Sequence, residues 1–203
     1  MRNTSGALAY AFDLLSKGPK YHFHNNVDAT HTHDVLKACR VLGEMEKLSG
    51  EELNILEVAA AYHDTGFILR YKANERFGVR FARSALPHFG YSQNDIETIC
   101  TTIMATQLDT SMKQQPTSLL QRILCDADLF HFGGPEFHEK TELLRQELAG
   151  QGITISPEKW REINSKFLAG HTYFTESARK LRDAGKQANL QALCSYRPAM
   201  DHS

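Results

Sequence analysis

In this sequence, several histidine and aspartate residues, which are potential metal ligands, occur among apolar residues. His63 and Asp64 end residues 53–64, the most apolar helical stretch of the chain, and His31 shares a helix face with Val35. Burying an imidazole and an ionised carboxylate is costly unless a partner compensates them. A divalent cation would be such a partner, so the pattern indicates a metal site.

A further carboxylate is expected where the chain reads Asp126-Ala127-Asp128, at the end of an apolar segment. Each aspartate continues a row of apolar residues at four-residue steps, so the spacing does not decide between them. With the three residues above, either one completes a set of two nitrogen and two oxygen ligands for a borderline or hard divalent ion. The alternative, that each residue is paired within the core or caps a helix, suits single positions better than the whole set.

The elements that would position these side chains are helices. Apolar residues recur at helical spacing, and no Asn-Gly or Asp-Gly turn joins β-branched stretches, so we predict an all-α fold. Two units are expected: a helical core of residues 1–150, and C-terminal helices of residues 151–203 that dock on it. Helices are predicted at residues 6–16, 30–42, 50–64, 75–86, 93–105, 119–127, 135–148, 157–168 and 172–193.

The order of these motifs is that of a known superfamily. His31-Thr32-His33-Asp34, then His63-Asp64-Thr65-Gly66, then Asp126-Ala127-Asp128 resembles the HD superfamily of metal-dependent phosphohydrolases, in its HDTG-type subgroup. The resemblance covers about residues 21–133. It implies an HD-domain helical bundle with extra C-terminal helices around one divalent ion, which would be Mn, Mg, Ni, Zn or Fe. The implied ligands are His31, His63, Asp64 and Asp128, with Asp126 as the second choice.

The resemblance also implies an activity. A metal-activated water would hydrolyse a phosphoester of a small metabolite or nucleotide, and Asp64 would bind the ion while orienting that water. Lys72 and Arg76 are expected to neutralise the phosphoryl group, and His24 to contact the substrate or its leaving oxygen. Each of these three is also explained as an ordinary solvent-exposed residue.

Two other functions remain as alternatives. A di-metal oxygenase of the same superfamily would need further histidines near Asn74 and near residues 105–107, and the sequence has none there. A catalytically silent HD domain that binds a ligand or regulates a partner would be expected to lose a metal ligand first, and the set is intact. His171 and Tyr173 would either close over a substrate pocket or dock the last helices on the core, and docking is favoured.

Composition limits the partners. The 203 residues include 23 Lys plus Arg and 24 Asp plus Glu, for a formal net charge of −1, which argues against a general nucleic-acid binder. No run of about 18 apolar residues offers a membrane span, and no signal peptide is recognisable. We therefore expect a cytoplasmic protein with a small phosphorylated substrate. The protein–protein association that we consider is a homodimer. The metal would supply the positive charge that the composition lacks.

Overall fold

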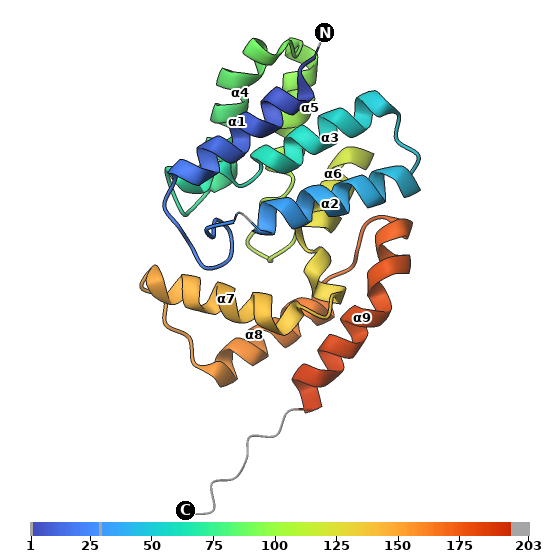
Figure 1. Cartoon of the computed structure of the whole chain (residues 1–203). Helices are drawn as coiled ribbons and strands as arrows, with labels where there is room; N and C mark the ends of the chain where they lie inside the picture. Colours follow the sequence, from blue (N-terminus) through green and yellow to red (C-terminus); the bar gives the residue numbers. More distant parts are fainter. Residues whose placement is uncertain (1, 29, 196–203) are drawn as a thin grey trace, which may run out of the picture.

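The computed structural model describes residues 2–28 and 30–195, and the regular secondary structure of these residues is helical, with no strand (Figure 1). The all-α prediction is confirmed. None of the described helices is both long and apolar enough to cross a membrane. Short 3-10 turns, η1 (Thr65–Ile68), η2 (Leu86–Phe89) and η3 (Phe130–Gly133), connect some of the α-helices. The α-helices are α1 (Thr4–Lys17), α2 (Thr30–Met45), α3 (Gly50–Tyr62), α4 (Asn74–Ala85), α5 (Gln93–Met104), α6 (Leu119–Asp128), α7 (Phe137–Gly150), α8 (Pro157–Gly170) and α9 (Glu176–Ser195).

Helix boundaries follow local signals in most places. Ser49 and Glu52 form a capping box at the start of α3, with the Glu52 side chain accepting the Ser49 N–H at 2.9 Å. At its other end α3 stops at Tyr62, two residues before the predicted end. The Thr65 hydroxyl donates to the carbonyl of Tyr62 at 2.7 Å and so satisfies one of the last helical acceptors. His63 and Asp64 therefore occupy the turn that follows the helix.

The predicted start of the last helix at residue 172 is wrong by four residues, because α9 begins at Glu176. The backbone N–H groups of Phe174 and Thr175 donate to the carboxylate of Asp126 at 2.7 and 2.8 Å. These contacts hold the segment before α9 outside the helix. The Thr175 hydroxyl accepts from the N–H of Ala178 at 3.2 Å and caps the start of α9.

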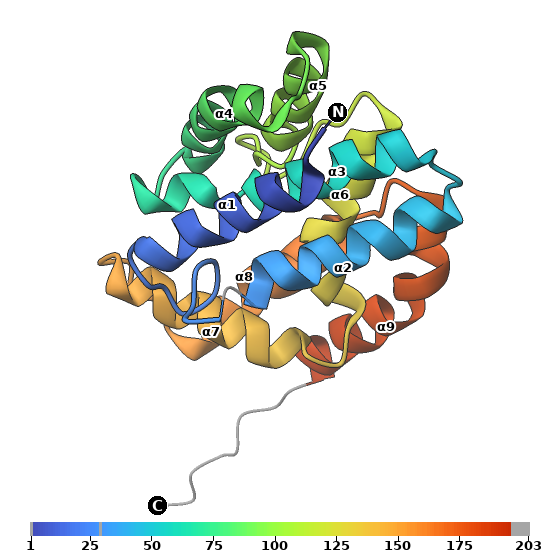
Figure 2. The same cartoon turned by 45° about the horizontal axis from the view of Figure 1, so that its top comes forward.

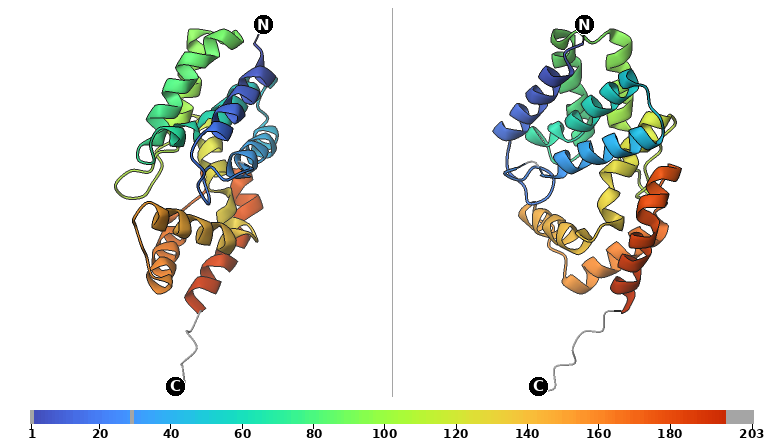
Figure 3. Two further views of the ribbon diagram at one scale, coloured as in Figure 1. Left: turned by 60° about the vertical axis from the view of Figure 1, so that its left-hand side comes forward. Right: turned by 45° about the vertical axis from the view of Figure 1, so that its right-hand side comes forward.

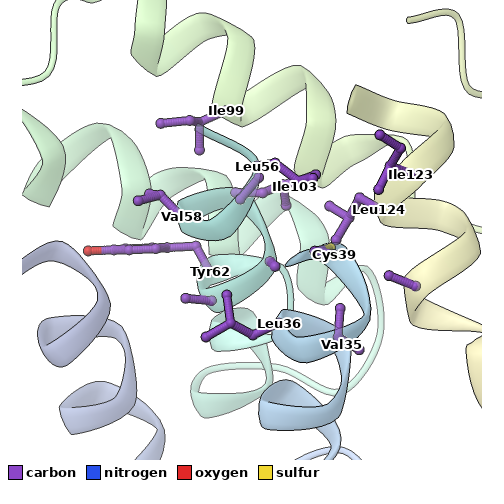
Figure 4. Close-up of a cluster of buried hydrophobic side chains, with 14 of the residues drawn as sticks. Val35, Leu36, Cys39, Leu56, Val58, Tyr62, Ile99, Ile103, Ile123 and Leu124 are labelled. Carbon is purple, nitrogen blue, oxygen red and sulfur yellow. The ribbon is translucent and has the colours of Figure 1, made fainter. Parts of the chain in front are cut away.

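The core lies around α3, which is buried on nearly all sides, as its sequence predicts. Figure 4 shows Leu56 and Tyr62 of α3 packed among side chains of α2, α5 and α6, including Cys39 and Ile103. All four of these side chains are 0% exposed. This packing fixes the relative positions of α2, α3 and α6, and the candidate metal ligands lie in α2, in the turn after α3 and at the end of α6.

The helices are arranged in three groups (Figures 1 and 3). α1, α4 and α5 lie at one end, α2, α3 and α6 in the middle, and α7, α8 and α9 at the other end. Tyr173 is fully buried and its hydroxyl lies 3.3 Å from the carbonyl of Leu129, which agrees with the docking interpretation. The division between residues 1–150 and 151–203 stays a prediction, and residues 196–203 of the second unit lie outside the described residues.

One glycine permits a close approach that the site needs. A Cβ on Gly66 would collide with the backbone carbonyl of Asn74, so only glycine lets η1 lie against the first turn of α4. The Asn74 side chain then donates to Oδ1 of Asp64 at 3.1 Å. The Thr65-Gly66 pair thus ends α3 and also brings α4 to the candidate site.

Candidate metal centre

Four of the predicted residues come together at the centre of the molecule. His31 lies in the first turn of α2, His63 and Asp64 follow α3, and Asp128 ends α6. Nε2 of His31 lies 3.4 Å from Oδ2 of Asp64 and 3.2 Å from Oδ1 of Asp128. Nε2 of His63 lies 3.2 and 3.7 Å from the same two oxygens. His31, His63 and Asp128 each offer a ligand atom within 4.8 Å of the other two, and Oδ2 of Asp64 lies beside both imidazoles.

Contacts behind three of the four side chains, those of His63, Asp64 and Asp128, orient them towards one another. Nδ1 of His63 lies 2.7 Å from the carbonyl of Ala60, which leaves Nε2 to face the cluster. Asn74 holds Oδ1 of Asp64, and Gln114 donates to Oδ2 of Asp128 at 3.1 Å. Each carboxylate therefore has one oxygen engaged by an amide side chain and the other directed at the histidines.

The atoms that face the cluster fit a metal ion. Nε2 of His31, Nε2 of His63 and Oδ2 of Asp64 are all buried, and none has a hydrogen-bond partner among the described residues. Buried polar atoms are seldom left unpaired, because each loses its hydration without compensation. Imidazole nitrogens and carboxylate oxygens are ordinary ligands of divalent ions, so a cation would satisfy the three atoms at once.

The charges of the cluster indicate the same partner. Burial alone lowers the pKa of His63, but the carboxylates of Asp64 and Asp128 outweigh burial and raise that pKa well above its ordinary value. Burial alone raises the pKa of Asp128, and His31 and His63 outweigh it and hold the pKa below its ordinary range. The two carboxylates thus make the centre attractive to positive charge.

Asp126, the second choice for the fourth ligand, faces another part of the molecule. It is 0% exposed and accepts the N–H groups of Phe174 and Thr175 and the Thr175 hydroxyl, the last at 2.6 Å. Both of its oxygens are engaged in these contacts. Asp128 is therefore the aspartate that the fold brings to the histidines, while Asp126 anchors the segment that enters α9.

His24 lies beside the centre. Its ring stacks on Phe67 with centroids 4.4 Å apart and meets His31 edge-on at 5.7 Å. Nδ1 of His24 lies 2.5 Å from Oε1 of Glu147, a buried carboxylate that also accepts the Tyr71 hydroxyl at 2.8 Å. Burial alone lowers the pKa of His24, but Glu147 and the carboxylates of the centre raise it overall. His24 is thereby favoured as a cation next to the site.

The other two predicted substrate contacts are placed differently. Lys72 and Arg76 are both exposed, at and just before the start of α4. A cavity of about 440 Å³ reaches His31 and Asp128, and neither basic residue lines it. A second cavity of about 460 Å³, between residues 108–114 and α8, contains none of the four candidate ligands. Substrate binding by Lys72 and Arg76 stays a prediction.

Three further residues lie near the centre, and the sequence does not predict a role for them. Glu75, at the start of α4, has a buried Oε2 that no described residue hydrogen-bonds, and burial and the nearby Asp64 and Asp128 raise its pKa. Its signal was proximity to the His-Asp turn. Glu147 follows Leu143 and Leu144 in α7, so a carboxylate one turn after apolar residues is its sequence signal. Gln114 lies in a loop whose path the sequence does not indicate, and it had no signal.

Comparisons with known proteins agree with this geometry. The model of the HD domain family matches residues 28–133, more than half of the chain. A crystal structure described as a predicted HD superfamily hydrolase, from an uncultured Thermotogales bacterium, aligns with 94% of this chain and 88% of its own at 18% identity and a TM-score of 0.63. The structure of Bacillus subtilis YpgQ in complex with ADP aligns with 94% of this chain and 91% of its own, at 18% identity and a TM-score of 0.65. Among curated proteins, none matches this chain.

Proposed function

Because the chain belongs to the HD domain family, we propose that it is a metal-dependent phosphohydrolase that cleaves a phosphoester of a small metabolite or nucleotide with water. The observation that carries the proposal is the group of three buried ligand atoms on His31, His63 and Asp64, which have no hydrogen-bond partner within residues 2–28 and 30–195, with Asp128 beside them. In our proposal these four residues hold one divalent ion. In the described part of the chain, Asn74 and residues 105–107 offer no histidine for a second ion, so a single ion is favoured over a di-metal oxygenase centre.

The residues of the chain have distinct roles in this proposal. A divalent ion held by the four side chains would lower the pKa of a coordinated water and polarise a phosphoryl oxygen. Asp64 would bind the ion through Oδ2, because its other oxygen accepts the Asn74 amide instead of being free to orient a water. The expected second role of Asp64, orienting the water, is therefore better supplied by another carboxylate.

Glu75 is the residue we assign to acid–base work. Its free Oε2 is buried, and its raised pKa brings it closer to neutral pH, where a carboxyl group exchanges protons most effectively. It would accept a proton from the attacking water and return one to the leaving oxygen. His24, with its raised pKa, would place positive charge near the phosphoryl oxygens, as expected for it from the sequence.

A nucleotide is one substrate class within this proposal. YpgQ, which shares the fold at a TM-score of 0.65, was crystallised in complex with ADP. A phosphorylated ligand is therefore accommodated by at least one relative in fold. We include nucleotides with phosphomonoesters as the substrates to test first.

The test is phosphate release from nucleotides, cyclic nucleotides and phosphomonoesters, measured with Mn²⁺, Mg²⁺, Ni²⁺ or Zn²⁺. We expect turnover by the wild-type chain and loss of about 1,000-fold or more in His63→Ala, because the lost ligand removes the metal-dependent chemistry. His33→Ala is the matched control, since His33 is an exposed histidine of α2 that stacks on Phe12. A folded, metal-replete wild-type protein that is inactive across the panel would contradict the proposal and favour a binding or regulatory domain.

A second variant separates the acid–base role from metal binding. Glu75→Gln keeps the size of the side chain and removes its titration, so we expect kcat to fall by about 100-fold or more while metal content stays that of the wild type. Parallel loss of metal would instead make Glu75 a structural partner of the centre.

A further inference from the structure

A cavity opens beside the candidate metal centre, between α2 on one side and η3, α7 and α9 on the other. We call this cavity of about 440 Å³ the α2–α9 pocket. Figure 2 shows α2 passing α7 and α9 where the middle helices meet the C-terminal ones. Its wall includes His31 and Asp128, so a molecule bound in it would touch two of the four proposed ligands.

Three basic side chains lie in the wall of this pocket, and two of them have no acidic partner among the described residues. The guanidinium of Arg182 lies over the ring of Phe130, 4.1 Å from its centroid, and Nε of Arg182 is buried with no hydrogen-bond partner in the part of the chain that the structure describes. Lys37 is exposed at the pocket rim and makes no hydrogen bond or ion pair with any described residue. Lys140 differs, because its ammonium group donates to Asp34 at 2.6 Å.

The other ionisable groups of the pocket leave these two cations in excess. Asp34 is engaged by Lys140, Asp128 faces the histidines of the centre, and Glu136 is the remaining acid in the wall. His131 also lies in the wall and is buried. Two unpaired cations therefore face one acid, next to apolar surface from Val35, Val41 and Leu181.

We propose that the α2–α9 pocket binds the part of the substrate beyond the reacting phosphate, and that this part carries a second anionic group held by Arg182 and Lys37. The proposal rests on the proposed function and names its substrate class: a small molecule with two anionic groups. A planar guanidinium pairs with a phosphate or carboxylate through two parallel hydrogen bonds, and stacking on Phe130 holds its plane in place. The C-terminal helices thus supply substrate selection to a centre built by the middle helices.

The test measures the binding of inorganic anions and simple phosphate esters to the purified full chain by calorimetry. Two probes carry two anionic groups each: pyrophosphate has two phosphates, and phosphoglycolate has a phosphate and a carboxylate. Orthophosphate is the reference with a single group. We expect the Kd of at least one two-group probe to rise about tenfold in Lys37→Ala and in Arg182→Gln, with a smaller change for orthophosphate. Which probe responds identifies the second group. Arg182→Lys, which keeps the charge, should restore part of the affinity.

Controls keep the outcome tied to the pocket. Lys180→Ala removes an exposed cation of α9 that does not line the pocket, and it should leave every Kd unchanged. Lys37 is exposed, so its removal does not threaten folding. Unchanged affinity for both two-group probes in Lys37→Ala and Arg182→Gln would overturn the proposal, as would an equal loss for orthophosphate. The expected shifts in a protein without hydrolytic activity would support the pocket and count against the proposed function alone.

Discussion

The two sides of the last turn of α6 carry two aspartates with opposite surroundings. Asp126 accepts three donors from residues 174 and 175, whereas Asp128 presents Oδ1 to His31 and His63. The pKa of Asp126 is raised, because burial outweighs its hydrogen bonds, and the pKa of Asp128 is lowered, because the two histidines outweigh burial. One carboxylate is satisfied by the fold itself, and the other is poised for a cation.

This difference teaches that burial alone does not identify a ligand. Both aspartates lie at the end of one helix and follow apolar rows, yet only one has an oxygen that faces other potential ligands. The fold compensates Asp126 with backbone donors and leaves the centre to be compensated by an ion. The following predictions test that separation of roles.

The largest expected effect on folding comes from Asp126→Ala. The change leaves two backbone N–H groups and one hydroxyl without their acceptor, so we expect the free energy of unfolding to fall by about 2–4 kcal/mol. Urea denaturation of the metal-free proteins measures it. Asp128→Ala, the matched change on the other side of the turn, should lower the free energy of unfolding by less, because it also removes the repulsion between the neighbouring carboxylates of Asp64 and Asp128. Equal losses of unfolding free energy in the two variants would contradict the different roles of Asp126 and Asp128.

A smaller effect is expected from Gln114→Leu. Gln114 fixes the outer oxygen of Asp128, and loss of such a supporting hydrogen bond typically weakens metal binding about 10- to 100-fold. Metal affinity is measured by competition with a chelator, and the Co²⁺ absorption spectrum reports ligand geometry. Gln115→Leu, an exposed neighbour, is the control, and the account fails at this point if the two variants bind metal alike.

The smallest effect is expected from Thr175→Val. The hydroxyl of Thr175 donates to Asp126 and caps α9, so its removal should reduce the free energy of unfolding by about 1 kcal/mol and leave metal affinity unchanged. Thermal denaturation with a parallel metal titration checks both readings. A loss of metal affinity would mean that the two sides of α6 are coupled.

The sequence predicts the fold class and most of the centre because those depend on local patterns. Apolar spacing locates α2, α3 and α6, and a histidine or carboxylate on a buried row indicates His31, His63 and Asp64. The choice between Asp126 and Asp128 depends on donors 48 and 49 residues away, at Phe174 and Thr175. Spacing within one helix carries no information about them, and the resemblance to a known motif supplied that choice.

Long-range packing also explains what the sequence reasoning did not find. Glu147 reaches His24 from 123 residues away, and Arg182 comes to the α2–α9 pocket only because α9 packs on η3. Lys72 and Arg76 are near the His-Asp turn in the sequence, but the structure places both of them on the surface. The charged residues that lie near the site are determined by which helices pack there, and not by their distance from the site along the sequence.

The most direct test of the account is the metal content of the purified chain and of its Asp126→Ala and Asp128→Ala variants, measured by inductively coupled plasma mass spectrometry on folded protein. The account predicts one divalent ion per wild-type chain, retained in Asp126→Ala and lost in Asp128→Ala. Two ions per chain, or an ion that depends on Asp126 and not on Asp128, would contradict it.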